Sequence, residues 1–174
     1  AKNIILDEIN REKKRNRIVP DLIQIGAMLE VPSLAFAPNS FFKSVDFLMV
    51  GGNDLKQFFF AADRENEKVR KRYDMLSTSF LSFLKLIVKK SEKYKLPLSY
   101  CGEDAGRPIE ALVLCSLGFK KLSMQPNCIA PVKSLLRNIK LNQIKQIVDS
   151  ALESNYETVR NQVVEYLEDI KYNN

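Results

Sequence analysis

The sequence predicts an α/β fold in which parallel strands are covered by helices. Short apolar runs of strand length alternate with longer segments of helical periodicity through most of the 174 residues. The apolar runs are nearly continuous, which is typical of strands buried on both faces of a parallel sheet. With 45% hydrophobic and 28% charged residues, the composition suits one globular domain over residues 1–174.

The strands are expected in a series of apolar runs. LIQIGAMLEVPS (22–33) is the first and ends at Pro32, and VDFLMV (45–50) is the second. LPLSYC (96–101) is the third, and KKLSM (120–124) is the last and weakest. The segments between these runs are long enough to cross from one parallel strand to the next.

Helices are expected before and between these strands. Ile4, Ile5 and Ile9 begin a polar helix near the amino end. The segment TSFLSFLKLIVKKSEKY (78–94) has strong helical periodicity over four to five turns. PIEALVLCSLG (108–118) predicts a shorter helix that ends at a glycine, the residue that most readily adopts the left-handed C-cap conformation.

Beyond the last strand the pattern is helical throughout. PVKSLLRNI (131–139) opens with a proline at a plausible first-turn position, and LNQIKQIVDSAL (141–152) repeats apolar residues at helical spacing. The final helix is expected after a capping box at Ser154–Glu157. Its apolar stripe consists of Val159, Val163, Leu167 and Ile170.

Charge and composition exclude several classes of function. The net charge is +6, but Lys85, Lys89 and Lys93 lie at helical spacing on what reads as a solvated face, and no nucleic-acid-binding motif accompanies them. The absence of histidine excludes a Ser-His triad and a phosphohistidine within this chain. No apolar run is long enough to cross a membrane, and three unpaired cysteines favour free thiols, so we expect a cytoplasmic protein.

Polar residues recur where the apolar runs end. Glu30 closes the first run, Asn53 and Asp54 follow the second, and Cys101 and Glu103 close the third. In parallel sheets the carboxyl ends of the strands lie side by side and carry the ligand site. These residues are therefore expected to share one rim of the sheet.

The two rim carboxylates predict a magnesium site, with an alternative for each residue. Glu30 and Asp54 on adjacent strand ends would give hard oxygen ligands, which suit Mg²⁺ shared with a substrate phosphate. Asp54 also reads as a helix cap before LKQFFF, and Glu30 as an ordinary strand-end carboxylate in water. The pattern of residues leaves both alternatives open.

Arg64 and the cysteines carry similar alternatives. Arg64, in AADREN, either binds a phosphate or carboxylate or is a surface arginine in a charged stretch. Cys101, next to a glycine, is either core packing or a thiol that transfers a proton. Cys115 and Cys128 lack such a setting and are interpreted as structural.

Several blocks together resemble one enzyme family. MLEVPS, GGNDLKQF followed by AADREN, CGEDAG, and LSMQPNCIAPVKSLLR occur here in the order and spacing of the carboxyl-terminal barrel of phosphoenolpyruvate-protein phosphotransferases, the Enzyme I family. The resemblance covers roughly residues 20–140. AMLEVPSL, GRPIEAL and VRNQVVEYL are most similar to the nitrogen-regulatory branch. Pyruvate phosphate dikinases and phosphoenolpyruvate synthases share some blocks, so a fragment of one of those enzymes is the enzymatic alternative.

The resemblance implies a partial (β/α)8 TIM-type barrel, roughly strands five to eight, with extra carboxyl-terminal helices. It implies that phosphoenolpyruvate binds with Mg²⁺ and that its phosphoryl group passes to a histidine on another domain, then to a small histidine phosphocarrier protein. Carried over by motif, Glu30 and Asp54 are magnesium ligands, and Asn53, Asp54 and Arg64 bind substrate. Cys101 is the acid that protonates the enolate of pyruvate.

Two positions depart from the family pattern. Gly52 stands where the family usually has Thr or Ser, so a hydroxyl that helps to fix the loop is missing. Asp104 stands where the family usually has Met, which adds negative charge near a site for an anion. We expect weaker substrate binding as a result, and an affinity gain on Asp104→Met in the complete enzyme.

The resemblance also implies that residues 1–174 are the carboxyl-terminal half of the barrel domain, without the phosphohistidine and amino-terminal domains. Such a half barrel has unpaired strand edges and an apolar interior, so we expect a homodimer. A self-associating dimerisation scaffold with idle ligand residues is the alternative function. Because the chain has no histidine to receive a phosphoryl group, it is expected to be inactive alone.

Overall fold

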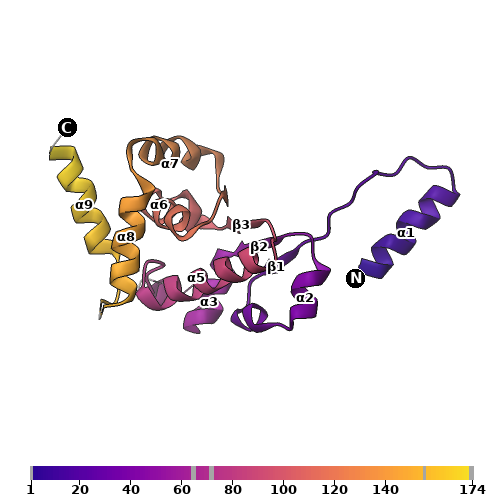
Figure 1. Cartoon of the computed structure of the whole chain (residues 1–174), viewed down its shortest axis with the longest axis horizontal. Coiled ribbons are helices and arrows are strands. Elements are labelled where there is room, and N and C mark those ends of the chain that lie inside the picture. The colour runs from indigo at the N-terminus through magenta and orange to yellow at the C-terminus, as the bar shows by residue number, and fades with distance from the viewer. Residues whose placement is uncertain (1, 64–65, 71–72, 155, 173–174) are drawn as a thin grey trace.

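A computed structural model describes residues 2–63, 66–70, 73–154 and 156–172. Strands and helices alternate through the middle of the chain, and helices alone follow (Figure 1). The first half contains α1 (Lys2–Lys14), β1 (Ala27–Leu29), the 3₁₀ helix η1 (Pro32–Phe36), α2 (Asn39–Ser44), β2 (Leu48–Gly51), α3 (Gly52–Phe60), α4 (Glu67–Arg70) and α5 (Thr78–Lys93). The second half contains β3 (Leu98–Cys101), the 3₁₀ helix η2 (Glu103–Gly106), α6 (Pro108–Leu117), β4 (Lys121–Ser123), α7 (Pro126–Asn138), α8 (Leu141–Leu152) and α9 (Arg160–Tyr172).

The strands form one parallel sheet in the order β1-β2-β3-β4. Sequential neighbours pair throughout, as in a segment of a (β/α)8 barrel, so the predicted fold class is confirmed. The first strand is much shorter than the run that predicted it, because its register with β2 covers only Ala27–Leu29. Just before it, the carbonyl of Ile25 accepts a hydrogen bond from the amide of Asp46, but no strand forms there. Residues 22–26 instead belong to the connection from α1.

The two faces of the sheet differ in burial. Leu29, Val50 and Tyr100 are aligned across β1, β2 and β3 and are at most 1% exposed. This row packs against the helices as part of the hydrophobic core. Along each strand, successive side chains point to opposite faces.

The opposite face carries a second aligned row: Met28, Met49, Ser99 and Lys121. Met28 is 42% exposed, and Lys121 is exposed as well. We refer to these residues as the open row. Its polar half on β3 and β4 corrects the expectation of an apolar interior, because only β1 and β2 contribute large apolar side chains to it.

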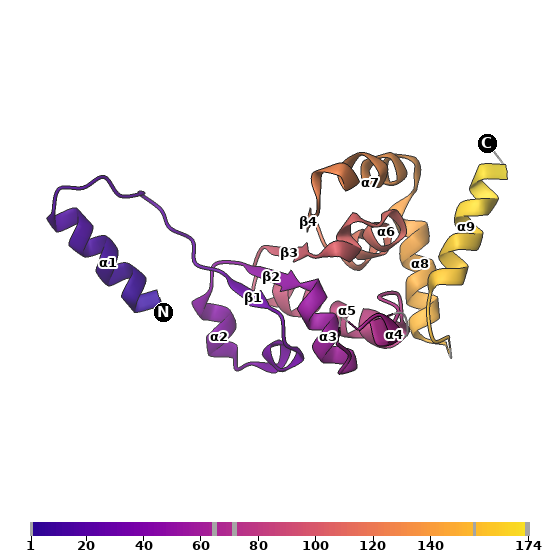
Figure 2. The same ribbon diagram turned by 180° about the vertical axis from the view of Figure 1, so that it is seen from behind.

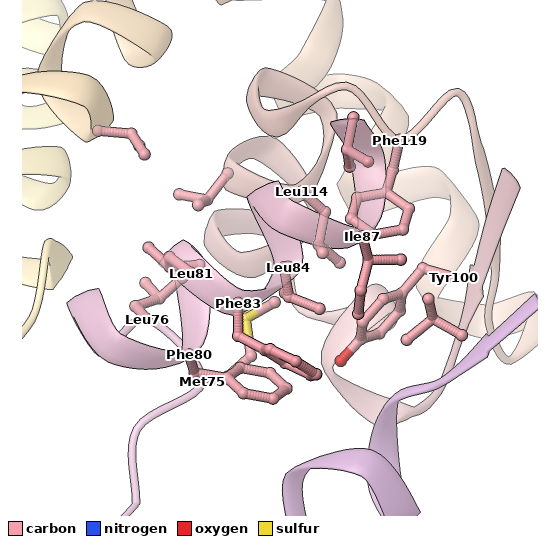
Figure 3. Close-up of a cluster of buried hydrophobic side chains, with 14 of the residues drawn as sticks. Met75, Leu76, Phe80, Leu81, Phe83, Leu84, Ile87, Tyr100, Leu114 and Phe119 are labelled. Atoms are coloured by element: carbon pink, nitrogen blue, oxygen red, sulfur yellow. The ribbon is translucent and has the colours of Figure 1, made fainter. Parts of the chain in front are cut away.

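Helix α5 supplies much of the core. It begins where the hydroxyl of Ser77 accepts a hydrogen bond from the amide of Phe80, which satisfies one of the amides that the first turn leaves unpaired. Its buried face consists of Phe80, Leu81, Phe83, Leu84, Ile87, Val88 and Ser91, and Figure 3 shows several of these side chains packed towards Tyr100 and Phe119. Lys89 and Lys93 are exposed on the other side, and Lys85 is partly exposed, which supports the prediction of a solvated face.

Helix α6 is buried on nearly every side, between the sheet, α7 and α8 (Figure 2). Pro108 occupies its first turn, and Gly118 ends it with φ of 116°, which confirms the predicted glycine cap. The expectation for Pro131 was wrong. Helix α7 begins at Pro126, so Pro131 lies inside the helix rather than in its first turn.

The capping box predicted at Ser154–Glu157 is also absent among the described residues. The Ser154 hydroxyl donates to the carbonyl of Ala151 at the end of α8, and α9 begins only at Arg160. There the amide of Arg160 donates to the Thr158 hydroxyl. The connection between α8 and α9 is therefore longer than the motif implied, because the chain first pairs with the segment before α5 through Val159.

Helix α1 lies at the end of a long connection in both Figure 1 and Figure 2. Nζ of Lys2, its first residue, donates a hydrogen bond of 3.2 Å to the carbonyl of Ser44 at the end of α2. None of the described residues of α1 is buried. Within the described ranges, no helix has the length and apolarity needed to cross a membrane. The three cysteines are free, as predicted.

Candidate active site

The carboxyl ends of the strands meet at one rim, as the sequence predicted for its polar residues. Gly51, Cys101 and Ser123 are aligned across β2, β3 and β4. Glu30 directly follows β1 and lies beside Gly51, since a Cβ built on Gly51 would be 2.8 Å from a carboxylate oxygen of Glu30. The sheet thus brings Glu30 and Cys101 to the same edge from opposite sides of β2.

Asn53 and Asp54 lie in the first turn of α3, directly beyond the end of β2. The helix begins at Gly52, and its N-cap is Gly51 without a side-chain hydrogen bond. The reading of Asp54 as an N-cap residue was therefore wrong. As a first-turn acid, Asp54 is instead placed favourably towards the positive end of the helix dipole.

The first turn of α3 is hydrogen-bonded to the loop after β3. The side-chain oxygen of Asn53 accepts a hydrogen bond of 3.2 Å from the backbone amide of Glu103. Between them lies Gly102, with φ of 156°, and a Cβ there would approach the same Asn53 oxygen to 3.1 Å. The glycine therefore lets the two rim segments touch.

A cavity of about 650 Å³ opens beside this contact. Asn53, Cys101 and Glu103 line it, so three of the predicted rim residues share one hollow. The rest of its wall consists of Gly102, Gly106, Arg107, Ser123, Met124, Gln125 and Cys128. Glu30 and Asp54 stand at the same rim but are not part of this wall.

Sequence reasoning missed several residues of the wall. Ser123 lies at the carboxyl end of the weakest predicted strand and Gln125 follows it, so the rim rule applied to that strand would have found them. Cys128 was interpreted as structural, yet it lines the cavity, where its sulfur lies against Gly106. Cys115 lies away from the rim in α6, where burial raises the pKa of its thiol.

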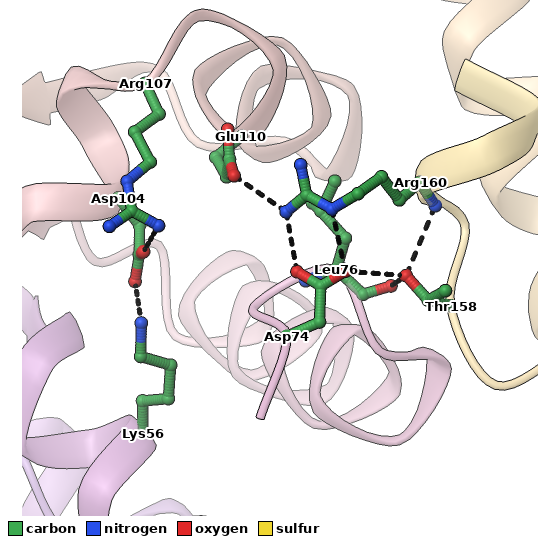
Figure 4. A network of polar contacts seen from close by, with 8 residues as sticks. All are labelled: Lys56, Asp74, Leu76, Asp104, Arg107, Glu110, Thr158 and Arg160. Carbon is green, nitrogen blue, oxygen red and sulfur yellow. Dashed lines mark hydrogen bonds and ion pairs between the residues drawn. The ribbon is translucent and has the colours of Figure 1, made fainter. Parts of the chain in front are cut away.

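Asp104 was expected to add negative charge near the site, and its carboxylate is paired with two cations. Its side chain is 1% exposed, and its Oδ2 atom accepts a hydrogen bond of 2.7 Å from Nζ of Lys56. Nη1 of Arg107 lies 3.3 Å from the other oxygen (Figure 4). Two cations therefore balance this carboxylate beneath the rim.

Tyr100 occupies the space that a side chain at position 52 would need. A Cβ on Gly52 would lie 2.2 Å from the Tyr100 hydroxyl oxygen. That hydroxyl is fully buried and finds no hydrogen-bond partner among the described residues. Burial, followed by the nearby charge of Asp104, raises the pKa of Tyr100 well above its usual value.

The predicted magnesium ligands can be compared with the chemistry that Mg²⁺ requires. Within the described ranges no group of three or more His, Cys, Asp or Glu residues is arranged to hold a metal ion. Mg²⁺ is commonly held by one or two carboxylates together with substrate phosphate and water. Two carboxylates at one rim, Glu30 and Asp54, fit that requirement. Arg64 lies outside the described residues.

Comparison with known proteins decides the family. The family model described as PEP-utilising enzyme, PEP-binding domain, matches residues 1–141. The chain belongs to this family. The rim just described is therefore part of a PEP-binding domain.

Proteins similar to this chain include phosphotransferases from several bacteria. It is 40% identical over 146 residues to a phosphoenolpyruvate-dependent phosphotransferase system protein of Salmonella typhimurium, covering 83% of this chain and 20% of the relative. A protein of the same description from Escherichia coli is 37% identical, covering 94% and 23%. A phosphoenolpyruvate-protein phosphotransferase of Latilactobacillus sakei is 34% identical, covering 93% and 28%. The chain thus spans less than a third of the length of these relatives.

Proposed function

We propose that this chain supplies the carboxyl-terminal part of the barrel of an Enzyme I, the enzyme that moves the phosphoryl group of phosphoenolpyruvate to a histidine and then to a small histidine phosphocarrier protein. The observation that carries the proposal is the cavity shared by Asn53, Cys101 and Glu103, beside Glu30 and Asp54. The similarity to phosphotransferases of that description supports this reading over a dikinase or synthase. The blocks AMLEVPSL and VRNQVVEYL favour the nitrogen-regulatory branch.

The carboxylates have a defined role in this proposal. Glu30 and Asp54 would hold Mg²⁺, which neutralises charge on the transferring phosphoryl group when it is bound. Asn53 donates through its amide nitrogen to a phosphate oxygen, while its side-chain oxygen accepts from the amide of Glu103. Because the carbonyl end of the amide is held, its donor end has a fixed direction. Arg64 pairs with the remaining substrate charge.

Cys101 has the role of acid. When the phosphorus–oxygen bond breaks, the electron pair stays with the oxygen and leaves the enolate of pyruvate. The thiol of Cys101 gives its proton to the methylene carbon, which yields pyruvate and a thiolate. Its place in the wall of the cavity supports this role, since an acid must reach the substrate.

The phosphoryl acceptor lies outside these 174 residues, because they contain no histidine. We therefore propose that residues 1–174 act as one unit of the barrel domain within an assembly that includes a phosphohistidine domain. Alone, the chain would bind substrate without turnover. A cytoplasmic location accompanies this proposal, because the phosphocarrier and phosphoenolpyruvate would have to be met there.

The test is an isothermal titration of phosphoenolpyruvate into this chain, with and without Mg²⁺. We expect Mg²⁺-dependent heat that disappears in Asp54→Ala. Asp149→Ala, which removes a half-buried carboxylate of α8 that pairs with Lys85, is the matched control and should bind like the wild type. Binding that is unaffected by Mg²⁺ or by Asp54→Ala would overturn the assigned roles.

A homodimer is a second proposal, supported by the open row. Met28 is 42% exposed on an edge strand, next to Met49 on the same face. An unpaired edge beside exposed apolar side chains favours pairing with another chain. Light scattering at rising concentration should show a mass increase that Met28→Lys abolishes, and a constant monomer mass would defeat this proposal.

A further inference from the structure

Two charged residues flank the hydrogen bond between Asn53 and Glu103. Lys56 lies one helical turn after Asn53 on α3, and Asp104 directly follows Glu103 on η2. Their side chains meet at 2.7 Å, across 48 residues of sequence. The ion pair therefore joins the same two segments as the hydrogen bond does, on the buried side of the rim.

The low exposure of this ion pair makes its attraction strong and makes the loss of either partner costly. Asp104 is 1% exposed and Lys56 only 23% exposed, so water does little to screen their attraction. A charge-assisted hydrogen bond at this distance holds its partners in a narrow range of geometry. If either residue is removed, the other is left as a poorly solvated charge, and the segments are expected to separate to let water in.

Arg107 contributes less to the same cluster. It is 57% exposed and its Nη1 atom lies 3.3 Å from Asp104, on the cavity side. The oxygen that Arg107 approaches, Oδ1, accepts no hydrogen bond from the described residues, so Arg107 contributes an ion pair without one. Lys56 is thus the cation that holds Asp104 by a hydrogen bond, whereas Arg107 is the more exposed partner and lines the cavity.

We propose that Lys56 and Asp104 are a positioning pair, which fixes the first turn of α3 against the loop after β3 and thereby sets the place of Asn53 relative to Cys101. Neither side chain has to touch substrate for this. The geometric part of the inference stands on the contacts alone, and its catalytic meaning rests on the proposed function.

The test uses amide hydrogen exchange, followed by NMR on the 174-residue chain. Lys56→Met and Asp104→Leu each break the pair, and the double variant replaces it with an apolar contact of similar size. We expect exchange of the Glu103 amide to rise roughly tenfold in each single variant and to fall back towards wild type in the double variant. Arg107→Met is the matched control and should stay within about twofold.

A second amide separates positioning from general instability. The amide of Leu81, a buried residue of α5, donates to the carbonyl of Ser77, outside the two segments that the ion pair joins. An equal rise at Leu81 and Glu103 would mean that the pair only stabilises the fold, and would overturn the inference. Unchanged exchange at Glu103 in the single variants, or no recovery in the double variant, would overturn it as well.

Titrations of phosphoenolpyruvate into the same variants test whether the ion pair affects substrate binding at the site. With Mg²⁺ present, we expect roughly tenfold weaker binding for Lys56→Met and recovery in the double variant. If the wild type shows no Mg²⁺-dependent binding, the proposed function fails for this chain, while the exchange data still decide whether the pair positions Asn53. If binding occurs and does not follow the exchange at Glu103, the positioning role is overturned and the proposed function stands.

Discussion

Arg160 at the start of α9 is joined by two hydrogen bonds to Asp74, which precedes α5 and lies 86 residues earlier in the chain. Nε lies 2.9 Å and Nη2 2.6 Å from the two carboxylate oxygens, a bidentate geometry. Nη2 also lies 2.8 Å from the carboxylate of Glu110 on α6 (Figure 4). Arg160 thus joins α9 both to the segment before α5 and to α6.

Replacing this arginine should destabilise the fold. In Arg160→Met, Glu110 would keep a carboxylate that is only 5% exposed and has lost its cation. We expect the free energy of unfolding in urea to fall by about 2 to 4 kcal/mol. Lys85→Met is the control, because the side chains of its pair with Asp149 are 34% and 38% exposed and the pair should be worth less than about 1 kcal/mol. Equal losses in the two variants would contradict this reading.

The pairing of Asp74 with Arg160 predicts that the protein loses stability at acid pH. Burial alone would raise the pKa of Asp74, but hydrogen bonds from Arg160, Leu76 and Thr158 and the charge of Arg160 outweigh it and lower the pKa below its usual value. A carboxyl with a lowered folded-state pKa stabilises fully above its unfolded value and loses that contribution as pH falls through the folded value. Unfolding measured between pH 6 and 2 should show this loss, with a shallower slope below pH 4 in Arg160→Met. Parallel slopes would rule it out.

Placing a serine at position 52, where the family usually has Ser or Thr, should destabilise the fold of this chain. A Cβ there would lie 2.2 Å from the hydroxyl oxygen and 2.3 Å from Cζ of Tyr100, both at the buried end of a packed ring. We expect Gly52→Ser to lower the free energy of unfolding by about 2 kcal/mol, through overpacking. In a Tyr100→Leu background the same substitution should have little effect. A similar loss in both backgrounds would show that Tyr100 is not the obstacle.

Removing the hydroxyl of Tyr100, in contrast, should not lower the free energy of unfolding. It is buried without a partner among the described residues, while its ring packs edge-on against Phe119 at 5.5 Å between centroids. Tyr100→Phe keeps the ring and should leave the free energy of unfolding unchanged or raise it by up to about 1 kcal/mol. Tyr94→Phe, which removes a hydroxyl bonded to Asn39, should lower it by roughly 0.5 to 1 kcal/mol. A loss in Tyr100→Phe larger than in Tyr94→Phe would reveal an ordered water on that hydroxyl.

The sequence predicted the elements well where local pattern and tertiary packing agree. The periodicity over 78–94 and 141–152 corresponds closely to α5 and α8, and Gly118 ends α6 as its conformational freedom requires. It failed at Pro131, because a proline at a first-turn position is indistinguishable by sequence from one within a helix that starts earlier. The first strand was overestimated because pairing, rather than apolarity, decides where a strand starts.

The sequence by itself determined the order of strands and helices and the rim that carries Glu30, Asn53, Asp54 and Cys101, since parallel strands place their carboxyl ends together. Only the tertiary structure decided which distant residues meet there. Lys56 pairs with Asp104, Tyr100 fills the space beside Gly52, and Arg160 reaches Asp74. Sequence periodicity reports which face of an element is buried, but contacts between elements depend on how the faces dock, which no local pattern records.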